Sequence, residues 1–200
     1  MTEEEWLAIE RPGCRAMLSH AKKVGRRPPR ATNRKFRLLA VALARCQNPN
    51  EELRRHCDLV ERYVDGLASQ AEFGAALQTR TRSSRYLGMS EEVRKLLWHD
   101  AFLSAIGFLG WNDAKTADLI REVFGNPFRS VAFAPEWRTG TAVALANQMY
   151  ITRDFSAMPI LADALQDAGC TQGEVLTHCQ DVNQVHVRGC WVVDLVLGKS

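Results

Sequence analysis

The sequence predicts an all-α fold, and three features of the chain support this prediction. In most segments apolar residues recur at intervals of three and four, the spacing that places them on one face of a helix. Most of these segments begin at a capping residue and end at glycine or proline. No segment shows the alternation of apolar and polar residues that is typical of a half-buried strand. We therefore expect a compact, irregular bundle of about ten helices, packed as antiparallel hairpins.

The bundle is expected to form a single domain over residues 1–200, with a basic helical part at residues 1–80 and the core at residues 90–200. The 200 residues are 46% apolar and 24% charged, which is typical of a globular protein with a buried core. No apolar run approaches the roughly 18 residues that span a bilayer. The acidic N-terminus, MTEEEWLAIE, differs from a signal peptide. We expect a cytoplasmic protein whose six scattered cysteines are reduced.

Capping residues and helix breakers define the helices of the first part. Thr2 and Glu5 have the spacing of a capping box, which starts the first helix. The stretch RRPPRATN interrupts the helical pattern because two prolines do not continue a helix, so the next helix is expected to begin at Asn33. Ser69 is placed to cap a further helix. We expect helices at residues 2–10, 12–25, 33–47 and 51–66, and another after Ser69.

The second part contains the most apolar helix, which we expect at residues 90–110 in the centre of the core. The segment PFRSVAFAPEWRTG is predicted to be irregular. Thr171 and Glu174 form a second capping-box pattern. We expect the remaining helices after Asp113 up to Gly125, and at residues 140–155, 158–168, 172–180 and 188–197.

Several motifs resemble those of an uncharacterised bacterial family of helical domains. Members of this family begin MTE-x-EWL, continue with K-x-RLLA-V-C and AERYADG, and share GNPFRPV, RDF-x-x-MPILADAL-x-DAGC and HVRGCWVVDLLLGK. The corresponding segments here are residues 1–7, 35–46, 60–66, 125–131 and 153–199. This chain has Ser130 where the family pattern usually has proline. The resemblance implies a bacterial domain, standalone or beside repeat or signalling domains, with no established activity.

Five potential metal ligands fall within 21 residues near the C-terminus. Thiolates and imidazoles are preferred zinc ligands, and four of them could form a tetrahedral site. The spacing matches no standard zinc motif. The simpler interpretation is that Cys179 and Cys190 are buried as apolar side chains while His186 bonds to a helix terminus. Zinc is therefore a possible cofactor and no other is expected. The candidate ligands are Cys170, His178, Cys179, His186 and Cys190.

The same region could supply a cysteine nucleophile, with Cys190, His186 and Asp194 as thiol, base and orienting acid. Cys190 and Asp194 are four residues apart and would share a helix face. No nucleophile elbow, phosphate-binding loop or metalloprotease motif accompanies them. The simpler interpretation is that Asp194 is a buried acid paired with Arg188 or with a helix end, so we assign no catalytic residue.

The net charge of +3 is unevenly distributed. Between Arg11 and Arg45 there are eleven lysines and arginines and no acidic residue. Such clustering could bind the phosphates of a nucleic acid or another polyanion, although the only aromatic residue of this window, Phe36, has the spacing of a core residue. The alternative is a solvated basic face. The candidate residues are Arg26, Arg27, Arg30, Arg34, Lys35 and Arg37.

Aromatic and arginine residues crowd the irregular segment that follows Gly125. This composition is typical of protein interfaces, and equally of a long loop packed against a helical core. The candidate interface residues are Phe128, Arg129, Phe133, Trp137 and Arg138.

Together these features favour a non-enzymatic protein-interaction or adaptor module that has a protein partner and no membrane partner. The alternative is a nucleic-acid-binding accessory protein that uses the basic segment at residues 11–45. A zinc-stabilised or cysteine-dependent enzyme is a third possibility. The sequence indicates no particular ligand and no oligomeric state.

Overall fold

The computed structural model describes residues 1–9, 13–24, 29–46, 49–78 and 114–199. These residues form ten α-helices and one short 3-10 helix, and no strand is found among them, which confirms the all-α prediction. None of the described helices is long and apolar enough to cross a membrane. Internal contacts divide the chain into two compact units, which we call unit 1 (Met1–Ile120) and unit 2 (Arg121–Ser200).

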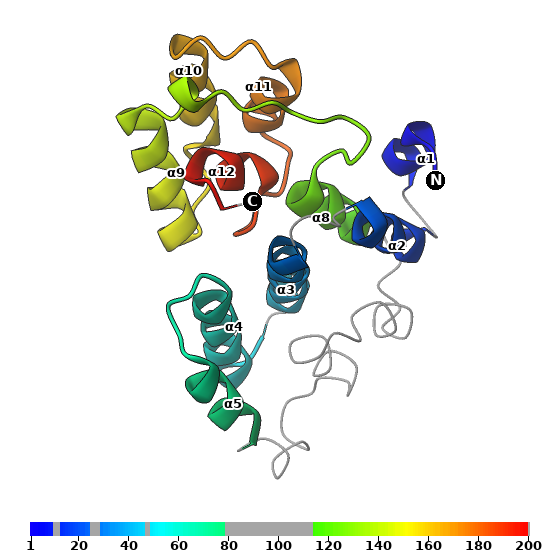
Figure 1. The fold of residues 1–200 in the computed structure, drawn as a ribbon, viewed down its shortest axis with the longest axis vertical. Helices are drawn as coiled ribbons and strands as arrows, with labels where there is room; N and C mark the ends of the chain where they lie inside the picture. The colour runs from blue at the N-terminus through cyan, green and yellow to red at the C-terminus, as the bar shows by residue number, and fades with distance from the viewer. Residues whose placement is uncertain (10–12, 25–28, 47–48, 79–113, 200) are drawn as a thin grey trace. The chain divides into compact units, whose positions relative to one another are not determined.

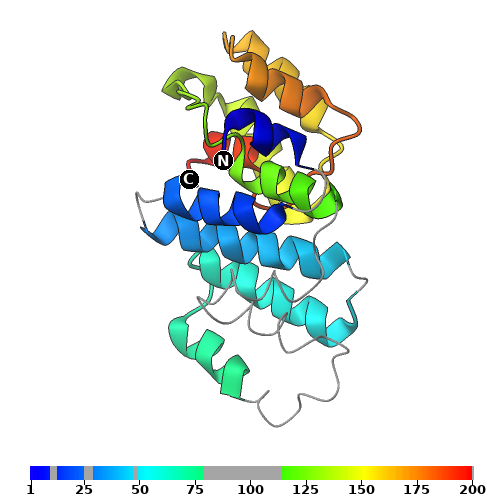
Figure 2. The same cartoon turned by 90° about the vertical axis from the view of Figure 1, so that its right-hand side faces the viewer.

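Unit 1 is built around a helical hairpin. Its helix α3 lies beside α4, and α5 contacts α4 in turn (Figure 1, Figure 2). Leu39 and Leu43 of α3 and Val60 of α4 are buried, as their helical spacing predicts. The helices are α1 (Glu3–Ala8), α2 (Cys14–Val24), α3 (Pro29–Cys46), α4 (Glu51–Val64) and α5 (Gln70–Gln78), followed by α8 (Ala114–Phe124), whose last turn belongs to unit 2.

Unit 2 is a small bundle of four helices with an irregular loop before them. Helix α12 lies between α9 and α11, while α10 contacts α9 and α11 (Figure 1). Met149, Leu161, Val175 and Val193 come from the four different helices and are at most 1% exposed, so each helix contributes one apolar face to the core. The elements are η1 (Pro135–Trp137), α9 (Gly140–Thr152), α10 (Met158–Asp167), α11 (Gly173–Gln180) and α12 (Trp191–Leu197).

Two helix starts confirm their predicted caps. The side chain of Thr2 accepts a hydrogen bond from the Glu5 amide at 3.1 Å, and the Glu5 carboxylate accepts one from the Thr2 amide at 2.8 Å. This exchange satisfies two amides that have no partner within the helix. At the start of α5, the hydroxyl of Ser69 accepts a hydrogen bond from the Glu72 amide at 3.0 Å.

At three other helix starts the structure differs from the prediction in a boundary or in the cap. Helix α3 begins at Pro29 and not at Asn33, since a proline in the first turn loses no intrahelical hydrogen bond. Helix α11 has Gln172 as its N-cap without a side-chain bond, and the Glu174 carboxylate pairs instead with Arg129 at 2.9 Å. Helix α12 begins three residues later than predicted because Gly189, with φ of 101°, interrupts the helical backbone. The helix predicted at residues 90–110 lies outside the described residues.

Candidate metal centre

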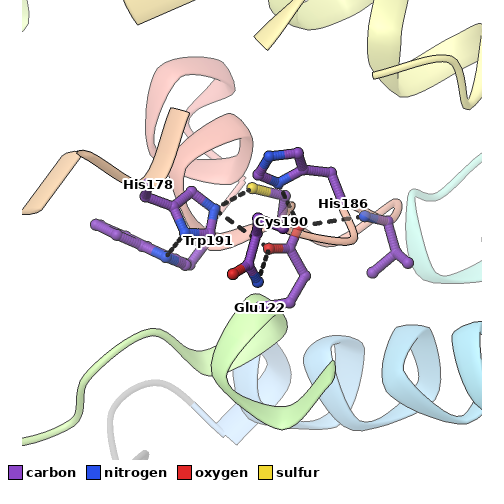
Figure 3. Close-up of polar contacts among 7 residues, drawn as sticks. Glu122, His178, His186, Cys190 and Trp191 are labelled. Carbon is purple, nitrogen blue, oxygen red and sulfur yellow. Dashed lines mark hydrogen bonds and ion pairs between the residues drawn. The ribbon is translucent and has the colours of Figure 1, made fainter. Parts of the chain in front are cut away.

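A buried carboxylate in the last turn of α8 organises the C-terminal part of unit 2. Glu122 is fully buried, and it faces three side chains that come from the end of the chain (Figure 3). His178 belongs to α11, His186 to the loop between α11 and α12, and Cys190 is the N-cap residue of α12. The side chains of His178 and His186 are 12% and 6% exposed. Four potential ligands thus meet in a site that is almost completely buried.

Hydrogen bonds converge on both oxygens of the Glu122 carboxylate. Oε1 lies 3.3 Å from Nδ1 of His186 and accepts a hydrogen bond from the Val187 amide at 3.1 Å. Oε2 lies 3.2 Å from Nε2 of His178 and 3.4 Å from the side-chain amide nitrogen of Gln184. A carboxylate offers about four lone-pair positions, so all of them have a partner in this arrangement. Such a carboxylate tolerates burial because its hydrogen bonds replace water.

The two histidines keep this carboxylate ionised. Burial alone would raise the pKa of Glu122, but the hydrogen bonds that its carboxylate accepts from His178 and His186 outweigh burial, so the pKa is lowered. Burial raises the pKa of the Cys190 thiol well above its ordinary value, and the charge of Glu122 raises it further. Without a cation in the site, Cys190 is therefore a thiol at neutral pH and a poor nucleophile.

Three separations within the cluster are close to those around a tetrahedral zinc ion. Nε2 of His178 lies 3.2 Å from both Sγ of Cys190 and Oε2 of Glu122, and the ligand atoms of all four residues lie within 4.8 Å of one another. Zinc bonds of about 2.0–2.1 Å to nitrogen or oxygen and about 2.3 Å to sulfur place neighbouring ligand atoms roughly 3.3–3.6 Å apart. Small movements of these side chains would therefore complete a four-coordinate site.

The structure brings together three of the five predicted metal ligands, His178, His186 and Cys190, and adds Glu122. The other two, Cys170 and Cys179, are buried in the apolar core of unit 2 and lie outside this ligand cluster. Burial raises the pKa of Cys179 to about 12, with a further contribution from the charge of Glu122. Both side chains therefore fit the alternative of buried thiols that pack as small apolar groups.

Glu122 was missed because nothing in the local sequence marks it as a ligand. It lies 64 residues before His186, in the helical segment LIREVF. The one available signal was its position three residues after the buried Leu119, on the same face of α8. An acid on an apolar helix face indicates a buried charge that needs partners.

A pocket of about 420 Å³ lies next to the cluster. His186 is shared between the pocket wall and the cluster, and its Nε2 is buried without a hydrogen-bond partner among the described residues. The imidazole is instead held by Nδ1 against Glu122 and by ring contacts with His178 and Phe155, at centroid distances of 5.0 and 6.2 Å. The pocket wall consists of residues 153–156, 158–159, 179, 181–182, 184 and 186.

The indole of Trp191 closes one side of the cluster. Its Nε1 donates a hydrogen bond to Nδ1 of His178 at 3.2 Å, and its ring packs against the backbone at Gly125. Gly125 ends α8 with φ of 66°, and a Cβ atom there would lie 3.2 Å from Cγ and Cδ2 of Trp191. The end of α8 and the start of α12 are thus in close contact.

Gly125→Ala is expected to destabilise unit 2 by about 2–3 kcal/mol. A left-handed backbone costs a non-glycine residue roughly 1–2 kcal/mol, and the new methyl group presses on Trp191. Gly198→Ala is the matched control, since Gly198 has φ of 65° and nothing within 4 Å of the added Cβ. Urea unfolding of both variants would separate the two costs. Equal losses of stability in the two variants would show that the contact with Trp191 contributes nothing to the loss in Gly125→Ala.

The predicted polyanion-binding residues are partly engaged within unit 1. Nε of Arg34 lies 3.2 Å from a buried oxygen of Asp65, and the Arg37 guanidinium lies 5.3 Å from the ring centroids of both Tyr63 and Phe73. Arg26 and Arg27, and the side chain of Arg30, lie outside the description. Lys35 is half-buried. Binding of a polyanion by this segment stays a prediction.

Three of the predicted interface residues hold the irregular loop on the core of unit 2. Phe133 and Trp137 meet edge to face at 5.3 Å, and Arg138 lies over Phe133 at 5.0 Å. Arg138 also donates two hydrogen bonds, of 3.2 and 2.9 Å, to the carbonyl of Leu195 near the end of α12. The remaining candidates lie at the surface: Phe128 is 37% exposed, and Arg129 forms the exposed ion pair with Glu174.

No protein-family model, curated protein or solved structure matches this chain. The resemblance to a bacterial family of helical domains therefore stays a prediction.

Proposed function

We propose that unit 2 is a metal-binding helical module, and that Glu122, His178, His186 and Cys190 hold one zinc ion or a divalent metal of similar preference. The observation that carries this proposal is the convergence of four ligand atoms within 4.8 Å of one another. A set with nitrogen, sulfur and carboxylate oxygen suits zinc better than magnesium or calcium, which prefer oxygen alone.

The role of the metal in this proposal is structural. Four protein ligands fill a tetrahedral shell, whereas catalytic zinc sites keep a position for water. The metal would join Glu122 at the end of α8 to His186 in the loop between α11 and α12. These two residues are 64 positions apart in the sequence. The high pKa of Cys190 is a further argument against a free thiolate nucleophile.

The module would act by binding a protein partner, as the sequence favours. The loop between α11 and α12 carries Val182 and Val185, which are 84% and 50% exposed. His186 follows Val185 directly, so a metal ion on His186 would order this loop. Exposed apolar side chains on an ordered loop are a common element of protein interfaces.

The test is titration of chelator-treated protein with Zn²⁺ and Co²⁺. We expect one metal ion per chain and, with cobalt, a thiolate charge-transfer absorption band. Cys190→Ser should abolish this band, and Glu122→Gln should weaken zinc binding at least about tenfold. The matched control is Cys46→Ser, which removes an exposed thiol in unit 1. No bound metal, or a cobalt band that survives in Cys190→Ser, would contradict the proposal.

A further inference from the structure

We propose that Trp191 opposes metal binding by holding His178 in the tautomer that cannot coordinate through Nε2. This inference rests on the proposed metal site and concerns its regulation. The evidence is the hydrogen bond from Nε1 of Trp191 to Nδ1 of His178, at 3.2 Å, on the side of the imidazole away from Glu122 (Figure 3).

The direction of this hydrogen bond follows from the chemistry of indole. An indole N–H is only a donor, so Nδ1 of His178 must present its lone pair and carry no proton. A neutral imidazole then carries its proton on Nε2, which lies 3.2 Å from both the Glu122 carboxylate and Sγ of Cys190. Every polar atom of His178 thus has a partner without a metal ion.

Metal coordination requires the opposite tautomer. The lone pair of Nε2 must face the metal, so Nε2 releases its proton to solvent and Nδ1 takes one up. Cys190 also releases its thiol proton, because the thiolate is the ligand. The new N–H on Nδ1 would then face the N–H of Trp191 at a distance where two donors repel each other. The indole bond must therefore break when the metal binds.

The position of Trp191 connects this change to the fold. Its ring contacts His178 at a centroid distance of 5.2 Å on one side and the backbone of Gly125 on another. Trp191 is also the first residue of α12. Release of the indole would therefore alter the junction between α8 and α12, so metal occupancy and the start of α12 are coupled.

The test compares wild type with Trp191→Phe, which keeps an aromatic ring beside Gly125 but removes the donor. Zinc affinity would be measured at constant pH by competition with a chromophoric chelator. We expect Trp191→Phe to bind zinc roughly twofold to tenfold more tightly, the value of one hydrogen bond. Trp137→Phe, at a buried tryptophan of the same core, is the control and should leave the affinity unchanged. Equal or weaker binding by Trp191→Phe would overturn the inference.

A second measurement needs no metal and no variant. Imidazole ¹⁵N chemical shifts of metal-free wild type report which nitrogen of His178 carries the proton, and we expect Nε2. A proton on Nδ1 would overturn the inference even if zinc binds well. If His178 has the expected tautomer and wild type still binds no zinc, the proposed function fails, and with it the control of metal access by Trp191.

Discussion

Glu122→Ala is expected to destabilise unit 2 by about 3–5 kcal/mol in metal-free protein. The substitution removes the acceptor of four donors, which come from His178, His186, Gln184 and the Val187 amide. A buried donor left without an acceptor costs about 1–3 kcal/mol, and several donors lose their acceptor here. The measurement is urea unfolding combined with amide hydrogen exchange of α11 and α12, which reports on unit 2 separately.

Two further variants separate charge, shape and burial. Glu122→Gln keeps the shape and one acceptor oxygen but presents an amide donor to one side of the cluster, so we expect an intermediate loss of about 1–3 kcal/mol. Asp163→Ala removes an exposed acid from α10 and should change stability by less than about 0.5 kcal/mol. A loss below about 1 kcal/mol for Glu122→Ala would show that the cluster does not hold unit 2 together.

The candidate site could be predicted only in part. His178, His186 and Cys190 were found because they lie close together in the sequence and have ligand chemistry. Glu122 comes from a helix 64 residues before His186, and only the folded chain brings the two together. Cys179 shows the reverse error, since proximity in sequence to His178 does not place its thiol among the ligand atoms.

The helices were predicted more completely because their signals are local. The capping box of Thr2 and the hydroxyl cap of Ser69 act within three residues, so sequence alone specifies them. The capping box predicted at Thr171 is absent from the start of α11, where Gln172 is the N-cap and the Glu174 carboxylate accepts a hydrogen bond from Arg129, 45 residues away. Local rules fail where a distant residue offers a better partner.

The same limit applies to the basic segment of unit 1. A count of charges identifies eleven basic residues without acids between Arg11 and Arg45, but the acids that neutralise some of them lie further along the chain. Arg45 is one example, with 2.7 Å from its guanidinium to Asp58 and 3.3 Å to the buried Glu61. Burial alone would lower the pKa of Arg45, but these carboxylates raise it.

Arg34→Met is expected to destabilise unit 1 by about 2–4 kcal/mol, whereas Arg15→Met, at an exposed residue of the same basic segment, should cost less than about 0.5 kcal/mol. The side chains of Arg34 and Asp65 are only 11% and 2% exposed, and their ion pair measures 3.2 Å. Removing the guanidinium leaves a buried carboxylate without this charge, a mechanism that costs several kcal/mol. The free energy of unfolding of the two variants would be measured in urea. Equal losses of stability would show that the ion pair of Arg34 with Asp65 does not stabilise unit 1.

The ion pair of Arg34 and the ring contacts of Arg37 determine how polyanion binding by the basic segment has to be tested. A charge reversal at Arg34 or Arg37 would disturb the packing of α3 on α4, so any loss of binding could result from unfolding. Lys35→Glu leaves the ion pair between Arg34 and Asp65 in place, and urea unfolding of this variant shows whether it stays folded. If labelled DNA binds with a steep salt dependence and Lys35→Glu reduces that slope by about one, phosphate contact is supported. If binding is absent at about 50 mM salt, this segment serves the packing of unit 1 and not a nucleic acid.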